Sequence, residues 1–578
     1  MRSLVGFWLV VVLVCASCTR SSPAQISSPE EQLFPDDKTP TVLSDLDERS
    51  IEVGTEFMTE SDGVITAVRF YQGPDNTGAD TASLWGMDGT EIATVHIPAG
   101  PAGWREVPFK QPVPVKADRN YVVSYHAARG HYSADSETFA GGRQVKSGWL
   151  TALGGVYTEG DMFPDQSSKG KNFYVDVLFR PTGPSLRPVD GGEHFYDQFK
   201  NSFPTSPDFF PLGVWFANTT SPADIASDRS LGLNTYVMLT AESNLQLIKD
   251  SGMFALPDKP NPFGAGQLLT DEADMWAGPG DAPWTGKTPP DPVCIPEDAE
   301  CGYTVMMTLR DAVPANVLSY ANYGKGVAFW QTRKQAERFI NDFQHLVSSD
   351  SYWFTDGNIC QAGEGGVLKN DGEADLPREE CQLAANYGLT TRHTRSLVQP
   401  WGSMPVWIFV ELGHPYEENG RTITPPEMRA AVWSSLINGA RGIVYFTHNF
   451  GGPCLSYNLL RDNCGDEIRP ELQAVNQQIS RLAPVLNAPF LDGYARSDGS
   501  VDLAVKRYQG SNYVLVGAAH NQPADATITL SCGEATSAEV IDENRTVPIT
   551  QRTLRDTFAD GNAVHLYRIE DATGCGVS

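Results

Sequence analysis

Polar and apolar residues alternate along the first and last parts of the chain, and a different pattern lies between them. From about residue 48 to 181, alternating stretches such as 63–70 are separated by turns rich in Gly, Pro, Asn and Asp. Alternation with period two indicates half-buried strands, and no helical period intervenes, so this segment is predicted to be a β-sandwich. The pattern returns at 488–578, in stretches such as 501–505 and 513–518, which predicts a small C-terminal β-sandwich.

Between residues 207 and 487, short apolar runs alternate with helical patterns, which is typical of parallel βα units. Eight alternations predict one (β/α)8 TIM barrel. The third unit is the weakest, because only residues 258–266 separate its strand from the next. Strands are expected at 209–216, 233–239, 253–256, 267–270, 316–320, 352–355, 406–410 and 442–446, and the clearest helices at 244–249, 333–346, 381–397, 426–438 and 470–486.

The N-terminus has the pattern of an export signal. Arg2 supplies a positive charge, and residues 4–14 form an apolar core too short to span a bilayer. The segment ends on Ala-Ser-Cys, which resembles a bacterial lipobox with Cys18 as the lipidated residue, although Cys15 occupies the position where an apolar residue is usual. Residues 1–18 therefore predict a surface lipoprotein, with simple secretion as the alternative.

Two further segments have the composition of connectors. Residues 19–47 are rich in Ser, Pro, Asp and Glu and are predicted to be a flexible tether. Residues 182–206 contain several Gly and Pro residues and are predicted to be a linker between the first sandwich and the barrel.

The composition suits a folded protein of more than one domain. The chain has 578 residues, of which 41% are hydrophobic and 10% aromatic. Its 71 acidic against 43 basic residues give a net charge of −28. That charge repels nucleic acid and anionic lipid and fits a neutral or cationic substrate. We therefore expect no nucleic-acid partner, and membrane contact only through an N-terminal lipid anchor.

Eight cysteines follow the export signal and fall into four pairs of sequence neighbours. Export places them in an oxidising compartment, which favours disulfides. Zinc is the alternative, but the mature chain has no CxxC and no histidine cluster near these cysteines. Pairing by proximity, one choice among 105 connectivities, gives Cys294–Cys301, Cys360–Cys381, Cys454–Cys464 and Cys532–Cys575.

Candidate chemistry gathers where the predicted barrel strands end, which is where TIM barrels carry function. The fourth strand runs into Asp271, Glu272 and Asp274, and the seventh ends on Glu411. We find no histidine cluster, phosphate loop or GxSxG motif after a strand. Paired carboxylates with aromatic platforms are what glycosidic bond cleavage needs. Candidate substrate-binding residues at the strand ends are Trp215, Asp271, Asp274, Trp276, Asn322, Tyr323, Trp353, Asp356, His414, Tyr445 and His448.

The barrel and the trailing β-domain resemble the (β/α)8 glycoside hydrolase superfamily called clan A. The resemblance rests on glutamates after the fourth and seventh strands, on Asn-Gly-Ala-Arg-Gly-Ile-Val-Tyr-Phe at 438–446 and on Leu-Ala-Pro-Val-Leu at 482–486. It implies a retaining hydrolase of poly- or oligosaccharides, with Glu272 as acid/base and Glu411 as nucleophile, and it implies no cofactor. The clan usually has Asn where this chain has Asp271, so Asp271 and Asp274 are alternatives for the acid.

The N-terminal sandwich resembles a functionally uncharacterised bacterial jelly-roll module. The resemblance rests on Val-Arg-Phe-Tyr at 68–71, Ser-Leu-Trp at 83–85, Gly-Trp at 103–104, Gly-His-Tyr-Ser at 130–133 and Asn-Phe-Tyr-Val-Asp at 172–176. Such modules accompany secreted carbohydrate-active and adhesive proteins, which implies sugar or surface binding. The alternative is a structural spacer.

The site residues also have structural interpretations. Glu272 can be a carboxylate favoured at a helix N-terminus, Asp356 a turn residue, and His414 and His448 structural polar residues. Trp407 lies mid-strand and is expected in the core. For the whole chain, the alternatives to a hydrolase are a non-catalytic carbohydrate-binding protein built on a glycosidase-like barrel and a structural or adhesive surface protein.

Overall fold

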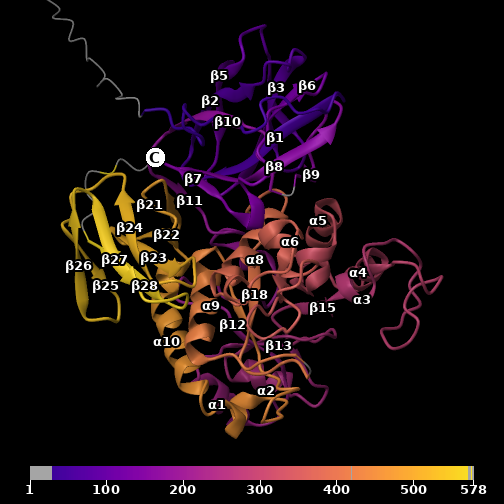
Figure 1. Ribbon diagram of the computed structural model, residues 1–578. Coiled ribbons are helices and arrows are strands. Elements are labelled where there is room, and N and C mark those ends of the chain that lie inside the picture. The colour runs from indigo at the N-terminus through magenta and orange to yellow at the C-terminus, as the bar shows by residue number, and fades with distance from the viewer. Residues whose placement is uncertain (1–28, 169, 418, 571–574, 576–578) are drawn as a thin grey trace, which may run out of the picture.

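The computed structural model describes residues 29–168, 170–417, 419–570 and 575. It has the predicted fold class: an N-terminal β-sandwich, a central parallel barrel with helices, and a C-terminal antiparallel sheet (Figure 1). The export signal and Cys18 lie outside the described residues. Within the described ranges, no helix is both long and apolar enough to cross a bilayer.

The N-terminal domain packs two antiparallel sheets around an apolar core. Its strands are β1 (Ile51–Thr59), β2 (Gly63–Gln72), β3 (Ala79–Gly86), β4 (Glu91–His96), β5 (Gly103–Val115), β6 (Asn120–Ala127), β7 (Val145–Ser147), β8 (Leu150–Glu159), β9 (Gln166–Ser167) and β10 (Val175–Pro181), with a short helix η1 (Ala140–Gly142). One sheet has the order β4-β3-β6-β1-β8-β7, with β9 beside β8, and the other has β10-β2-β5. Side chains that alternate along facing strands, such as Val53 and Phe57 on β1, are buried between the sheets.

The described part of the predicted tether, residues 29–47, lies against this sandwich. Leu33 and Phe34 are buried in its core, and their backbone amides donate to the Asp176 carboxylate at 2.8 and 3.0 Å. Arg69 pairs with the same carboxylate at 2.9 Å. The polar composition of the segment did not predict this contact with the core, because Leu33 and Phe34 form a run of just two apolar residues.

The barrel has eight parallel strands, each near its predicted place except the sixth. The strands are β12 (Leu212–Ala217), β13 (Thr235–Leu239), β14 (Phe254–Leu256), β15 (Gln267–Asp271), β16 (Ser319–Tyr323), β17 (Leu346–Ser349), β18 (Val406–Glu411) and β19 (Ile443–Phe446). They are ordered β14-β13-β12-β19-β18-β17-β16-β15. The ladder is open between β14 and β15, where Leu268 N donates to Pro257 O at 2.9 Å, so the barrel is nearly closed.

Helices surround the barrel between most of the strands (Figure 1). Three helices begin with a capping box, in which a Ser or Thr side chain and a residue three positions on satisfy the free amide groups of the first turn. The helices are α1 (Pro222–Ser230), α2 (Leu245–Asp250), α3 (Ala273–Trp276), α4 (Gly302–Asp311), η3 (Gly326–Trp330), α5 (Arg333–Asp342), α6 (Gly365–Asn370), α7 (Arg378–Cys381), α8 (Ala385–Ser396), α9 (Pro425–Ile437), η4 (Leu459–Arg461), η5 (Asn463–Gly465) and α10 (Arg469–Leu486).

The prediction for the sixth strand was wrong. It was expected at 352–355, but the strand is β17, and the predicted helix at 333–346 ends at Asp342. Half of β17 is serine, so its short apolar run resembles the end of the helix. Ser348 is buried because its hydroxyl donates to Asn322 Oδ1 at 2.6 Å. The residue that leaves the sixth strand is therefore Asp350.

The predicted linker closes the amino end of the barrel. Residues 185–187 form β11 (Ser185–Arg187), and η2 (Phe195–Gln198) follows. Four rings of the segment, Phe195, Tyr196, Phe199 and Phe203, join the inner core of the barrel. Phe203 packs on Trp407 with ring centroids 5.5 Å apart, and Trp407 is fully buried there, as expected of a core residue.

The C-terminal domain is an antiparallel sheet of ten strands that includes β11. The other strands are β20 (Phe490–Asp492), β21 (Ala495–Ser497), β22 (Val501–Tyr508), β23 (Ser511–Ala518), β24 (Ala524–Leu530), β25 (Ser537–Val540), β26 (Arg545–Thr550), β27 (Thr553–Phe558) and β28 (Val564–Ile569). The strand order is β11-β20-β22-β23-β28-β25-β26-β27-β24-β21. Figure 1 shows this domain beside the barrel, along α10.

Buried ion pairs join the three domains. Arg395 on α8 binds Asp190 at 2.5 Å and Asp118 of the sandwich at 2.9 Å. Arg187 binds Asp492 of the C-terminal sheet at 2.6 Å. Arg395 and Asp190 are both only 4% exposed, so removing one partner would leave a buried charge uncompensated.

Candidate active site

Glu272 follows β15 with an unusual backbone conformation. Its φ of 51° and ψ of 36° lie in the left-handed region, which is costly for a residue with a side chain and is found preferentially at functional sites. Its amide donates to Asn322 O at 2.9 Å, which ties the turn to β16. The Glu272 side chain makes no capping bond to the four-residue helix α3 that follows. Only the Glu272 carbonyl, which accepts from the Met275 and Trp276 amides, takes part in the start of that helix, so its carboxyl group has no capping role.

Asp274 is held in the structure by backbone groups. Its carboxylate accepts from the amides of Gly324 at 3.2 Å and Val327 at 2.7 Å, and it is 2% exposed. A side chain at Gly326 would place its Cβ 2.6 Å from Asp274 Oδ2. Asp274 thus fixes the loop after β16 against β15.

Asp271, Glu272 and Asp350 form a cluster of carboxyl groups around Asn322. Asn322 Nδ2 donates to Asp271 Oδ1 at 2.8 Å. The charge of Glu272 acts on the buried Asp350 carboxyl group and helps to raise its pKa. The sequence analysis did not predict Asp350 as a site residue, because it placed the sixth strand too late in the chain. With the strand at its correct place, Asp350 would have stood directly after its end.

Burial and mutual repulsion hold protons on this cluster. Burial, and then the charge of Glu272, raises the pKa of Asp271 to about 7. Burial, and then the charge of Asp274, raises the pKa of Glu272 to about 7. Burial and the charges of Glu272, Asp271 and Asp274 raise the pKa of Asp350 well above its usual value. Like charges this close cannot all ionise, so the cluster keeps a carboxylic acid at neutral pH.

Glu411 ends β18 and is fully buried. The hydroxyl of Tyr387 on α8 lies 2.6 and 2.7 Å from its two carboxylate oxygens, and Thr355 Oγ1 donates to Oε1 at 3.2 Å. Burial raises the pKa of Glu411 to about 7, while the bond from Tyr387 opposes that shift. Tyr387 had no signal in the sequence, because it belongs to the buried side of a helix far from any strand end.

The charges of Glu272 and Glu411 both act on two tyrosines, Tyr352 and Tyr416. The rings of Tyr352 and Tyr416 pack edge to face with centroids 6.2 Å apart. Burial raises the pKa of Tyr352, and the charges of both Glu272 and Glu411 add to the shift. The same two charges act on Tyr416. The charges of both glutamates therefore act on one tyrosine pair, which the sequence interpretation missed because it placed Tyr352 inside a strand.

Several other predicted residues lie at this end of the barrel. Trp215 points into the barrel and packs on Phe409 with centroids 5.2 Å apart. Trp276 Nε1 donates to Asp271 O at 2.6 Å. Lys325 bridges Asp356 and Glu364 at 2.6 and 2.7 Å, so Asp356 holds a loop together. His414 contacts Thr422 Oγ1 at 3.1 Å, and His448 is buried among aromatic rings.

Three residues expected to bind substrate are not brought to this site. Tyr323 donates to Phe339 O, Trp353 Nε1 to Thr390 Oγ1 and Tyr445 to Asn476 Oδ1, each at 2.8 or 2.7 Å. All three are fully buried against helices. Tyr323 and Tyr445 occupy the outward positions of their strands, where side chains alternate between barrel interior and helix layer.

The four predicted disulfides are confirmed. Cys294–Cys301, Cys360–Cys381, Cys454–Cys464 and Cys532–Cys575 are bonded, with Cα atoms 5.3–5.7 Å apart. The first three lie in the loops after β15, β17 and β19, at the end of the barrel that carries the carboxyl groups. Four disulfides indicate an oxidising compartment, as expected of an exported protein.

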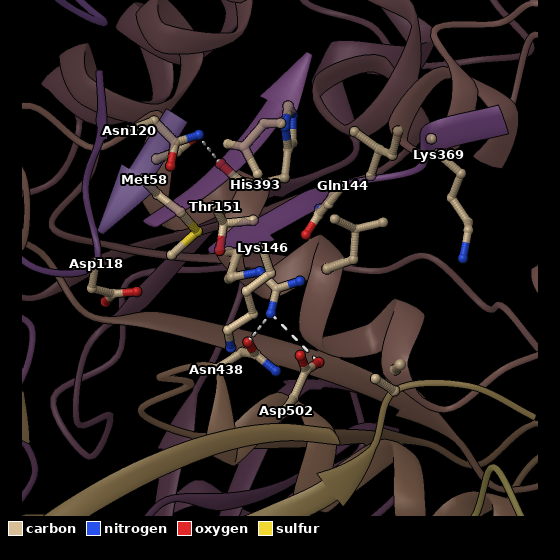
Figure 2. A pocket seen from close by; sticks show the side chains of 18 of the residues that line it. Met58, Asp118, Asn120, Gln144, Lys146, Thr151, Lys369, His393, Asn438 and Asp502 are labelled. Atoms are coloured by element: carbon tan, nitrogen blue, oxygen red, sulfur yellow. Dashed lines mark hydrogen bonds and ion pairs between the residues drawn. The ribbon is translucent and has the colours of Figure 1, made fainter. Parts of the chain in front are cut away.

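A cavity of about 1130 Å³ lies elsewhere, where the three domains meet (Figure 2). Asn120, Lys146, Lys369, His393 and Asp502 are among the residues around it. Neither Glu272 nor Glu411 lines this cavity, and its size alone does not make it the site of their chemistry. The carboxyl groups at the strand ends occupy the position at which TIM barrels act.

The N-terminal domain matches a known family. Residues 37–175 match a family model described as "Domain of unknown function (DUF4082)", which agrees with the uncharacterised module expected there. No curated protein matches the chain.

Solved structures of glycosidases match the chain distantly. An Anoxybacillus alpha-amylase shares 9% identity at a TM-score of 0.33, covering 64% of this chain and 99% of its own. A GH30 endoxylanase from Clostridium papyrosolvens C71 shares 11% at 0.33, covering 63% and 97%. A structure described as "Glycoside hydrolase" shares 12% at 0.35, covering 63% and 93%. These matches are too distant to indicate an activity.

Proposed function

We propose that the protein is an exported retaining glycoside hydrolase of a poly- or oligosaccharide, with Glu411 as nucleophile and Glu272 as acid/base. One observation carries the proposal: at the ends of the parallel barrel strands, Glu272 follows β15, while Glu411 ends β18, fully buried, and accepts a hydrogen bond from Tyr387. This is the chemistry of glycosidic bond cleavage, which needs one acid and one nucleophile or base.

The surroundings divide the roles. The Tyr387 hydroxyl donates to Glu411, which favours the charged form that attacks the anomeric carbon. Asp274 is bound by backbone amides and Asp271 by Asn322. Among the three acids that follow β15, this leaves Glu272 as the favoured proton donor.

The reaction takes two steps. Glu411 attacks the anomeric carbon while Glu272 gives its proton to the departing oxygen, which leaves as an alcohol. Glu272, now ionised, takes a proton from water, whose oxygen attacks the same carbon and releases Glu411. The sugar leaves with its original anomeric configuration.

The test is covalent trapping by a 2-deoxy-2-fluoro glycoside. The wild-type protein is expected to gain one glycosyl group on Glu411, located by peptide mass spectrometry, and Glu411→Gln is expected to gain none. Glu272→Gln is expected to hydrolyse substrates with poor leaving groups far more slowly than aryl glycosides with good ones. Undiminished turnover by Glu411→Gln would remove Glu411 from the mechanism.

One observation favours a second function, non-catalytic carbohydrate binding. Glu411 is 0% exposed, so substrate can reach it only if side chains that cover it move. Sugar binding without release of reducing ends, across a broad polysaccharide panel, would support this function over hydrolysis.

Export is part of the proposal, with Cys18 as a lipid anchor. Replacement of Cys18 by Ser is expected to move the protein from the membrane fraction to the medium. An unchanged distribution would argue for secretion without an anchor.

A further inference from the structure

The end of β19 carries two buried polar atoms without partners among the described residues. They are Thr447 Oγ1 and His448 Nε2, and the two residues are 0% and 4% exposed. Burial lowers the pKa of His448, so its imidazole is neutral at neutral pH and can accept or donate one hydrogen bond at this nitrogen. A buried polar atom left unpaired is costly, which points to a hydrogen-bonding ligand or water at this place.

Four rings surround the His448 imidazole. Phe446 and Phe216 lie at centroid distances of 5.1 and 5.8 Å, and Phe450 and Tyr457 at 5.5 and 6.2 Å. The last two stand at 83° to the imidazole and are 40% and 80% exposed. Aromatic faces open to solvent, together with a polar atom between them, match the apolar faces and hydroxyl groups of a sugar ring.

The loop that presents the exposed rings is held in shape. Asn449 and Ser456 exchange two backbone hydrogen bonds, at 2.8 and 3.1 Å, and the Cys454–Cys464 disulfide closes the loop. Asn449 Oδ1 also accepts from the His414 amide at 2.7 Å. A surface fixed in advance loses little freedom on binding, which favours a ligand site over an accidental exposure of Phe450 and Tyr457.

The rings around His448 lie next to the proposed active site. Phe446 lies opposite Glu411 in the parallel ladder, and its ring is 5.4 Å from that of Tyr352. Phe216 belongs to β12, so the surface covers β19 and β12, whereas Glu272 and Asp350 follow β15 and β17. Because the acid must reach the departing oxygen, the leaving group lies toward β15–β17, and the retained part of the substrate lies toward β19 and β12.

We propose that His448, Phe450 and Tyr457 form a subsite for a sugar unit on the retained side, next to the unit whose bond breaks. The inference rests on the proposed hydrolase function. The Phe450 and Tyr457 rings pack edge to face with centroids 6.3 Å apart, so the sugar stacks on their exposed outer surface, and His448 Nε2 bonds one of its hydroxyls. The substrate is therefore an oligomer or polymer, recognised over at least two units on this side.

The test compares substrate lengths. Phe450→Ala, Tyr457→Ala and the double variant are assayed on oligosaccharides of two to six units, prepared from a polysaccharide that the wild type digests, and on the aryl glycoside of one such unit. Each ring is expected to contribute about 3- to 10-fold to kcat/KM on the longer substrates. The aryl glycoside, which does not reach the subsite, is expected to change less than about 2-fold. Met162→Ala, at a 60% exposed residue of the N-terminal domain, is the matched control.

The outcomes separate this inference from the proposed function. Equal loss on long and short substrates, or no loss on either, would overturn the subsite. A concentration-dependent dimer abolished by the double variant would assign the exposed rings to self-association instead, and would also overturn it. If the wild type hydrolyses nothing, the proposed function fails, and calorimetry with the six-unit oligosaccharides of a polysaccharide panel decides the subsite. If Glu411→Gln binds these oligosaccharides and the double variant does not, the result supports the subsite. If no such binding is found, the subsite is overturned.

Discussion

Removing the Tyr387 hydroxyl should change the pH dependence of activity in a defined direction. The hydroxyl lies 2.6 and 2.7 Å from the two oxygens of Glu411, in a fully buried setting. A hydrogen bond to a charged group contributes about 1.5–3 kcal/mol. Since about 1.4 kcal/mol corresponds to one pKa unit, Tyr387→Phe should raise the pKa of Glu411 from about 7 by roughly 1–2 units.

The assay is the pH profile of kcat/KM. Glu411 must be ionised to attack, so activity falls as pH drops through its pKa, and the acid limb should move to higher pH in Tyr387→Phe. Glu272 must be protonated, so activity on the basic side, above its pKa of about 7, should stay unchanged. Because the raised pKa of Glu411 then exceeds that of Glu272, the maximum of kcat/KM should fall and move to higher pH. Thr355→Val removes a single 3.2 Å bond and should give a smaller shift in the same direction. An acid limb that does not move in Tyr387→Phe would refute the assignment of that limb to Glu411.

Further predictions concern stability. The pKa of Asp350 is raised in the folded protein, so its contribution is most favourable below its unfolded pKa of about 4 and is lost as pH rises. Asp350→Asn should therefore raise the unfolding midpoint more at pH 8 than at pH 5 while lowering activity, and calorimetry showing a lower midpoint at pH 8 would contradict this. Arg395→Met leaves buried Asp190 without its ion-pair partner, while Asp118 keeps Arg187, and should cost about 3–5 kcal/mol of unfolding free energy. The control Arg481→Met removes an exposed pair and should cost below about 1 kcal/mol; equal costs in denaturant titrations would refute the buried network.

The sequence predicted the elements that are marked by a simple pattern of apolar and acidic residues. The seventh strand was recognisable because five apolar residues end on Glu411, and the fourth because its run stops at adjacent acids. Disulfides between sequence neighbours were also predictable, since short loops close easily. These features need no knowledge of distant contacts.

The rest depended on contacts that a local pattern does not contain. Both serines of β17 are buried, and Ser348 donates to Asn322 on the neighbouring strand β16, so no long apolar run marks the strand. Tyr387 reaches Glu411 from a helix, far along the chain from any strand end. Which rings point inward also depended on the strand register, which turned Tyr323 and Tyr445 toward the helices.

The pairing of β11 with β20 affects how the chain can be made and shortened. Ser185 lies opposite Asp492, so the whole barrel is a loop inserted between two neighbouring strands of one sheet. During synthesis β11 leaves the ribosome about 300 residues before its partner, and its edge stays unpaired until then. A chain truncated after the barrel would keep that edge open permanently, and an open edge invites pairing between chains. The barrel should therefore be isolated with the C-terminal sheet attached, or with residues 185–187 removed as well.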